Sequence, residues 1–237
     1  MTQALRIISS MATKQLLADL IDLYRQNQQQ TDPRSQPQEI ALESLGGVDA
    51  ARRVQAGGTF DVVVLASNAI DQLIASGNVV AGSRVDVVNS GVAVAVQAGA
   101  ARPDISDEAA LQQAVLAART LGVSTGPSGV QLAKLFARWG IAGQIQNRTV
   151  TAPAGVPVGS LIAKGEVALG FQQLSELVNQ PGIKVLGPLP PEIQITTTFS
   201  GGLAATSTQS EAVRALLAFF ASPATADIKR RNGMDAV

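Results

Sequence analysis

The first third of the chain alternates between short apolar runs and stretches in which apolar residues recur at helical spacing. The run Leu5-Arg6-Ile7-Ile8 is mainly apolar and predicts a short buried strand, and residues 61–66 form a valine-rich run typical of a strand covered on both faces of a parallel sheet. After the first run, one helix face is predicted by Leu16, Leu17, Leu20, Ile21 and Leu23. Strand, small-residue turn and helix therefore alternate, which predicts an open α/β sheet with ligands at the carboxyl ends of its strands.

Similar patterns predict the other elements. Residues 26–37 are polar and contain two prolines, which indicates a surface loop. Ser67 or Asn68 is expected to cap a helix over residues 70–74, and Ser106 a helix over residues 107–121. Further strands are expected at residues 39–43, 91–96, 166–171, 183–186 and 194–200, and further helices at residues 50–55, 157–164, 172–178, 211–221 and from Pro223 onward.

The residue pattern of the first and last parts of the chain predicts one sheet, and that of the middle part predicts another. We therefore expect an α/β fold of two lobes, each a mixed sheet flanked by helices. Residues 1–84 plus 200–237 would form the first lobe and residues 85–199 the second. The chain would cross between the lobes near residues 84–93 and 194–204, and two crossings predict a hinge.

Two turns of small hydroxylated residues lead directly into helical patterns. Ser9 and Ser10 follow the first strand, and Ser128 lies in the run Ser124-Thr125-Gly126-Pro127-Ser128-Gly129. A helix start presents unpaired backbone N–H groups and the positive end of the helix dipole, which together favour an anion. Ordinary helix capping would also explain these serines without a ligand. In the same way, Gly46-Gly47 would be expected in a flexible turn that binds nothing. The two hydroxylated turns favour a small anion held across a cleft.

Composition excludes several other functions. Eighteen basic residues balance eighteen acidic ones, so nucleic acid is not an expected partner. The chain has no histidine and no cysteine, which removes disulfides, thiolate nucleophiles and most transition-metal sites. No apolar run reaches the roughly 20 residues of a membrane-spanning helix, so membrane insertion is not expected. No cofactor motif is present, and we expect no cofactor, no metal and no catalytic residue.

Several short segments, taken in order, resemble the molybdate-binding branch of the type II periplasmic-binding-protein family. They are Ala51-Arg52-Arg53-Val54-Gln55-Ala56-Gly57 with Asp61-Val62-Val63-Val64, then Asn89-Ser90-Gly91-Val92-Ala93-Val94, Gly126-Pro127-Ser128-Gly129 and Lys164-Gly165-Glu166-Val167-Ala168-Leu169-Gly170. The resemblance implies two α/β lobes that close on an oxyanion held by hydroxyls and backbone N–H groups. Carried over by position, it implies a site at Ser9, Ser10, Gly46, Gly47, Val48, Ser128, Val156 and Gln173.

The neighbours of these positions complete the predicted ligand-binding set. They are Met11, Lys14, Ser67, Asn68, Pro127, Gly129 and Pro157. The chain departs from the family at Gly46-Gly47, where serine hydroxyls are usual, and at Gln173, where a tyrosine is common. Lys14 adds a cation in the first turn of the first helix. Fewer hydroxyls and one added lysine favour an organic di- or tricarboxylate over molybdate.

Transport and catalysis remain alternative uses of such a site. As the resemblance implies, the chain would be the anion-binding component of an ABC transporter, with a permease as partner if it is exported. No leader pattern precedes the first strand, so the sequence as it stands indicates a cytoplasmic protein, or a periplasmic one if a leader has been removed. A cytosolic sensor or isomerase acting on a small acid would depend on Asp, Glu, Lys14 or Tyr24 for proton transfer. The absence of catalytic motifs favours a binding protein.

Overall fold

The computed structural model describes residues 4–34, 36–153 and 155–237. The chain divides into two compact units, of which unit 1 comprises Met1–Asn89 and Thr198–Val237 and unit 2 comprises Ser90–Thr197. Two strands carry the chain from one unit to the other. These are β4 (Val85–Gln97) and β9 (Thr196–Leu203).

The sheet of unit 1 is built on three neighbouring parallel strands. β1 (Leu5–Ser10) lies between β2 (Ile40–Leu45) and β3 (Val62–Ala66), and β9 runs antiparallel beside β3. Ser9 is aligned with Ser44 on one side and with Val64 on the other. Because the three strands are parallel, their carboxyl ends share one edge of the sheet.

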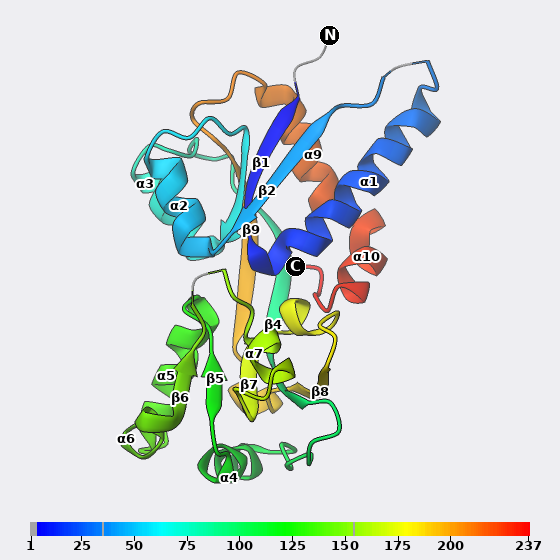
Figure 1. The fold of residues 1–237 in the computed structure, drawn as a ribbon. Coiled ribbons are helices and arrows are strands. Elements are labelled where there is room, and N and C mark those ends of the chain that lie inside the picture. The colour runs from blue at the N-terminus through cyan, green and yellow to red at the C-terminus, as the bar shows by residue number, and fades with distance from the viewer. Residues whose placement is uncertain (1–3, 35, 154) are drawn as a thin grey trace. The chain divides into compact units, whose positions relative to one another are not determined.

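Helices cover both faces of this sheet (Figure 1). One face carries α1 (Lys14–Thr31), α9 (Ser210–Ala221) and α10 (Ala226–Arg231), with the short turns η1 (Met11–Thr13) and η4 (Pro223–Thr225); the other carries α2 (Gly47–Gln55) and α3 (Ser67–Ala75). In β3, Val62 and Val64 pack into the core beneath α1 and α9, whereas Val63 and Leu65 pack beneath α2 and α3. This alternation confirms the predicted strand with two covered faces.

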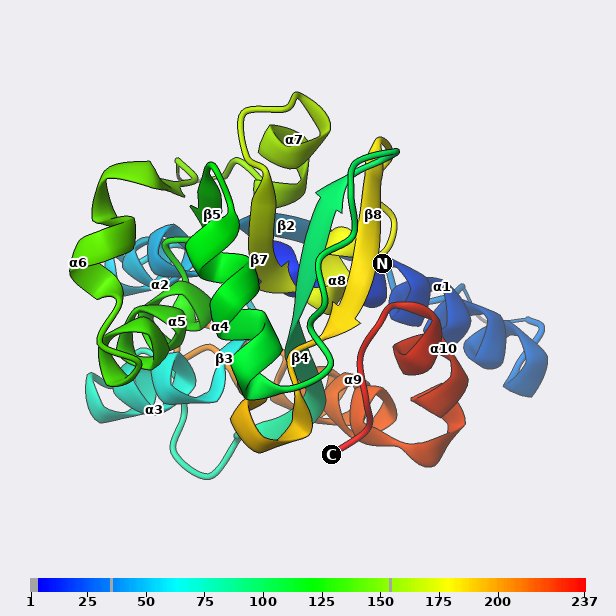
Figure 2. The ribbon, with the colours of Figure 1, turned by 90° about the horizontal axis from the view of Figure 1, so that it is seen from below.

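Unit 2 repeats the same plan. β5 (Leu121–Val123) lies between β6 (Thr149–Thr151) and β7 (Leu169–Gln173), and all three are parallel. β4 pairs antiparallel with β7, and β8 (Ile183–Pro188) with β4, so that β7, β4 and β8 lie side by side (Figure 2). The flanking elements are α4 (Glu108–Ala117), α5 (Pro127–Arg138), α6 (Ala142–Ile145), η2 (Gln146–Arg148), α7 (Val158–Ala163), α8 (Leu174–Leu177) and η3 (Pro191–Ile193).

The predicted helix over residues 107–121 was wrong at both ends. Asp107 is its N-cap instead of Ser106, because the Asp107 carboxylate accepts the Ala110 N–H at 2.8 Å. The helix ends at Ala117, and Leu121 already begins β5. Arg148 donates to the Val115 and Leu116 carbonyls, which satisfies the end of the helix. Neither β5 nor β6 was predicted, because three residues are too few to show a period.

Three other predictions need correction. α1 continues through the glutamines to Thr31, so the first part of the expected loop is helical. Ser67 and Asn68 lie inside α3, whose N-cap is Ala66 without any side-chain cap bond. Gln172 and Gln173 end β7 instead of opening a helix, and both are buried. The glutamines of α1 follow their own helix propensity, whereas pairing of β7 with its neighbours keeps Gln172 and Gln173 in the strand.

Candidate functional site

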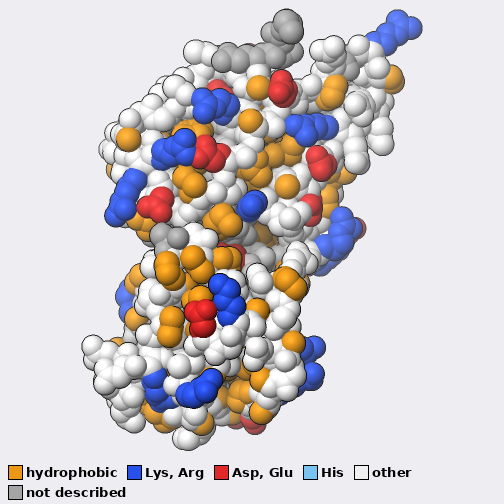
Figure 3. All heavy atoms as spheres, viewed as in Figure 1, with side chains coloured by type: hydrophobic (Ala, Val, Ile, Leu, Met, Phe, Trp, Pro, Cys, Tyr) orange, Lys and Arg blue, Asp and Glu red, His pale blue; other side chains and the backbone are white. Residues whose placement is uncertain are grey.

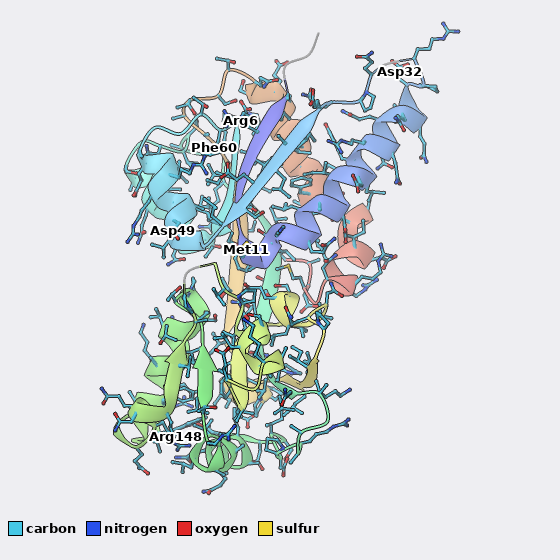
Figure 4. All side chains as sticks on the ribbon, viewed as in Figure 1. Arg6, Met11, Asp32, Asp49, Phe60 and Arg148 are labelled. Carbon is cyan, nitrogen blue, oxygen red and sulfur yellow. The ribbon has the colours of Figure 1, made fainter. Side chains whose placement is uncertain are left out.

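Three helical segments of unit 1 begin at the shared carboxyl edge of its parallel strands. η1 follows β1 after Ser10, α2 follows β2 from Gly47, and α3 follows β3 from Ser67. A Cβ built on Gly47 would lie 3.8 Å from the Ser10 Cβ, so the first two starts are close together. Figure 4 shows Met11 at this end of β1 and Arg6 at the opposite end. We call residues 9–14, 44–48 and 67–68 the unit 1 edge.

The unit 1 edge brings together all the residues that the sequence predicted for the first lobe. They are Ser9, Ser10, Met11, Lys14, Gly46, Gly47, Val48, Ser67 and Asn68. The Ser9 hydroxyl lies 2.8 Å from the Ser44 hydroxyl, a partner that sequence reasoning did not include. Ser10 occupies the N-cap position of η1, but its hydroxyl accepts no backbone N–H of that turn. Simple capping therefore does not account for the Ser10 side chain.

Ser67 is bound within unit 1. Its hydroxyl donates to the Thr198 carbonyl at 2.9 Å and lies 2.8 Å from the Ser200 hydroxyl. Ser200 donates in turn to Asp86 Oδ1 at 2.6 Å, and this bond is the main reason that the pKa of Asp86 is lowered. Arg84 pairs with the same carboxylate. Ser67 thus ties the start of α3 to β9. The Ser10 hydroxyl lies 3.5 Å from the Thr13 hydroxyl, a longer contact than those of Ser9 and Ser67, so Ser10 is the more weakly bonded hydroxyl of this edge.

Lys14 is the cation of the unit 1 edge. Its side chain is exposed and forms no ion pair with any described residue. The two arginines of α2 are both paired, Arg52 with Asp49 and Arg53 with Glu43. Lys14 is therefore the cation at this edge whose charge is available to an anion.

Unit 2 has the corresponding edge, where β5 leads to α5, β6 to α7 and β7 to α8. Ser128 is 3% exposed, and its hydroxyl lies 3.1 Å from the Ser124 hydroxyl. Ser124 also accepts the Gly126 N–H at 3.3 Å. A Cβ on Gly129 would lie 1.8 Å from the Ser124 carbonyl oxygen, so only glycine fits there. We call residues 124–129, 156–159 and 172–176 the unit 2 edge.

The other predicted residues of the second lobe lie on the remaining two segments of this edge. Val156 is 36% exposed, and Pro157 is the N-cap of α7. Gln173 is buried at the end of β7, where its Nε2 donates to the Thr197 hydroxyl at 2.8 Å. The Gln173 Oε1 is buried and has no protein partner within the described residues. This amide oxygen can therefore accept a hydrogen bond from a further donor.

Glu176 belongs to this edge although sequence reasoning missed it. Gln172 Nε2 donates to Glu176 Oε1 at 2.8 Å, and Gln172 Oε1 accepts the Val158 N–H at 2.8 Å and the Gly159 N–H at 3.4 Å. Burial raises the pKa of Glu176 to about 7, against an opposing effect of the Gln172 bond. The spacing of four residues between the glutamine and the glutamate was a signal for the contact, but burial of the carboxyl left no trace in the sequence.

The raised pKa of Glu176 predicts how stability depends on pH. Between pH 4.5 and about 7 the folded chain holds a proton that the unfolded chain has lost, so its free energy of unfolding falls as the pH rises through this window. The slope from this one group is at most about 1.4 kcal/mol per pH unit. Urea unfolding of the wild type and Glu176→Gln at several pH values measures it. Identical pH dependence in the two proteins would contradict the assignment.

The described residues show no other chemistry at either edge. They contain no cluster of three or more His, Cys, Asp or Glu side chains that could hold a metal ion. On the face drawn in Figure 3, basic and acidic side chains are mixed, and neither sign forms a continuous area. Within the described residues, no helix has the length and apolar character needed to cross a membrane.

Comparison with known proteins agrees with the architecture. Residues 5–235 match the family model described as bacterial extracellular solute-binding protein. A protein of Pseudomonas sp named aconitate isomerase is 39% identical over 200 residues, covering 83% of this chain and 76% of that protein.

Solved structures share the fold at much lower identity. The periplasmic molybdate-binding protein of Azotobacter vinelandii has a TM-score of 0.78 at 16% identity, covering 98% of this chain and 99% of that one. The sulfate-binding protein of Mycobacterium tuberculosis H37Rv has a TM-score of 0.75 at 17% identity, covering 99% and 87%. These likenesses confirm the expected type II periplasmic-binding-protein fold. Together with the family match over almost its whole length, they show that the chain belongs to the bacterial extracellular solute-binding protein family.

Proposed function

We propose that this chain binds a small organic polycarboxylate of the aconitate type, and that the unit 1 edge and the unit 2 edge are the places where it binds. The observation that carries the ligand class is the 39% identity to a protein named aconitate isomerase over 83% of the chain. The molybdate- and sulfate-binding structures are only 16% and 17% identical, so they support the fold and not the ligand. An oxyanion such as molybdate remains the alternative ligand.

The chemistry of the two edges suits a ligand with several separate carboxylates. Lys14 offers a charged donor that can bind one carboxylate, whereas Ser10, Ser128 and nearby backbone N–H groups are neutral donors for the others. A neutral hydrogen bond contributes only about 0.5–1.5 kcal/mol net, so a compact dianion would need many of them at one place. A tricarboxylate instead presents three separate carboxylates, each of which needs fewer donors.

A second candidate function is isomerisation of the bound acid, which the name of the same relative favours. Moving a double bond between carbon atoms requires a group that removes a proton from one carbon and returns one to another. Burial raises the pKa of Tyr24, whose ring packs against Phe219 at 5.1 Å between centroids, so Tyr24 is poorly suited to this role. Of these two side chains Lys14 is the better placed, because it lies at the unit 1 edge and its ammonium group can donate a proton.

Membership of the family supports a role in uptake. We propose that the chain acts outside the cytoplasmic membrane and delivers its ligand to an ABC permease. Co-purification of the ligand-loaded chain with that permease would test this role.

A thermal-shift panel tests the ligand class. With trans-aconitate, citrate, succinate, acetate, molybdate and sulfate, we expect the melting temperature to rise most with the tricarboxylates. A ligand at 100 times its Kd stabilises the folded chain by about 2.7 kcal/mol. A rise in melting temperature with molybdate alone would favour the alternative ligand over a carboxylate. No rise with any anion at millimolar concentration would contradict anion binding altogether. Proton NMR of the recovered ligand separates a binder, which returns it unchanged, from an isomerase.

A further inference from the structure

The partly buried carboxyl of Glu176 is connected to the start of α7 by a single glutamine side chain. Glu176 Oε1 accepts from Gln172 Nε2 at 2.8 Å, and Gln172 Oε1 accepts from the Val158 and Gly159 N–H groups at 2.8 and 3.4 Å. Gln172 is 3% exposed, so water does not compete freely for these bonds. The arrangement lies next to Val156, Pro157 and Gln173, which belong to the proposed ligand-binding set.

The orientation of the Gln172 amide depends on the protonation of Glu176. An ionised carboxylate only accepts hydrogen bonds, so Gln172 must turn its NH₂ group toward Glu176 and its oxygen toward α7. A neutral carboxyl can donate its O–H to the Gln172 oxygen. That bond competes with the bonds from the Val158 and Gly159 N–H groups, which are then less firmly held.

No described charge near Glu176 would hold it in one form. It lies on α8, which packs against β7 and β8. α8 has no other charged residue and β7 has none, whereas β8 contains only Lys184. Lys184 is exposed and forms no ion pair with Glu176. α7 has no charged residue, and Lys164, which follows it, is exposed and makes no such pair either. Glu176 therefore titrates in a neutral environment, with a pKa of about 7.

We propose that Glu176 is a positioning residue, which through Gln172 makes the start of α7 and the affinity of the neighbouring ligand site depend on pH. The part concerning affinity rests on the proposed function. Ionised Glu176 holds the α7 N–H groups on Gln172 and adds a negative charge close to an anion site. Both effects weaken anion binding above neutral pH.

Two readouts on the wild type and Glu176→Gln test the proposal. In the ligand-free protein, the Val158 and Gly159 amide resonances are expected to titrate with a midpoint near 7 in the wild type and to stay constant in the variant. For trans-aconitate, the wild-type Kd is expected to rise about fivefold from pH 6 to pH 8, and the Kd of Glu176→Gln to rise less. The titration of the ligand itself is common to both proteins and cancels in the comparison.

The two readouts test separate parts of the proposal. Amide resonances of Val158 and Gly159 that do not titrate overturn the proposal, whether or not any ligand binds. Titrating amides with the same pH dependence of Kd in both proteins overturn the link to affinity. Failure of trans-aconitate to bind at any pH contradicts the proposed function, and the amide readout still decides the role of Glu176. Lys164→Ala, directly after α7, is the control, since Lys164 is exposed and makes no ion pair with a described residue, so this variant should titrate like the wild type.

Discussion

Replacing Gly129 with alanine is expected to destabilise the chain by about 3 kcal/mol and to abolish ligand binding. The new Cβ would lie 1.8 Å from the Ser124 carbonyl oxygen, a distance that no rotamer change can relieve because both atoms belong to the backbone framework. The turn would have to move, and with it Ser124 and Ser128, whose hydroxyls lie 3.1 Å apart. Urea unfolding and calorimetric titration with trans-aconitate measure the two effects.

Gly126→Ala is the matched control in the same turn. Its nearest neighbour would be Ser124 Oγ at 3.7 Å, an ordinary contact, and its backbone has φ −79°, which any residue adopts. We expect this variant to keep the stability and affinity of the wild type within about 0.5 kcal/mol. Equal behaviour of the two alanine variants would show that close packing at Gly129 does not hold this turn.

Replacing Lys14 with alanine is expected to weaken binding of trans-aconitate by about 10- to 100-fold, because a hydrogen bond to a charged group contributes roughly 1.5–3 kcal/mol. Lys14 is exposed and makes no ion pair within the described residues, so its removal should leave the fold intact. The affinity for sulfate or molybdate should fall less, since neutral donors would bind a compact oxyanion. Calorimetric titrations of both proteins give the affinities.

Lys134→Ala provides the comparison for loss of one positive charge. Lys134 is an exposed residue of α5 outside both edges, so its replacement should change the affinity by less than about twofold. A Lys14→Ala protein with the wild-type affinity would make Lys14 a solvated helix residue and would remove one argument for a carboxylate ligand.

The local pattern of apolar residues was sufficient to predict the long, buried helices and strands. The valine run of β3 and the leucine spacing of α1 predicted both elements, because burial on two faces or on one helix face fixes the residue type. The order of strands and helices predicted two α/β lobes, and the resemblance of short segments to the molybdate-binding branch added the type II periplasmic-binding-protein fold. Both conclusions depend on residues close in sequence.

Elements whose stability comes from distant partners could not be predicted in this way. β5 has three residues and lies between β6 and β7, so its strand character comes from its neighbours. The end of α4 is fixed by Arg148, about thirty residues further along the chain. The glutamines of α1 are a different case, because glutamine is itself a good helix former and only the polarity of the segment suggested a loop.

The candidate site also contains residues that the sequence could predict and contacts that it could not. Ser10, Gly47 and Ser128 stand at helix starts that follow parallel strands, so the pattern could place them at sheet edges. The pairing of Ser9 with Ser44, the attachment of Ser67 to β9 and the burial of Glu176 are long-range or environmental properties. Only coordinates reveal them, and they determine which predicted hydroxyls are already bonded.

The central claim is that a small polycarboxylate binds at the unit 1 and unit 2 edges. Amide chemical shifts recorded during a titration with trans-aconitate test it directly. We predict that the resonances of Gly47 in unit 1 and Ser128 in unit 2 shift with a saturable dependence on the concentration of trans-aconitate. A saturable interaction that moves neither resonance, or no interaction at millimolar concentration, would contradict the claim.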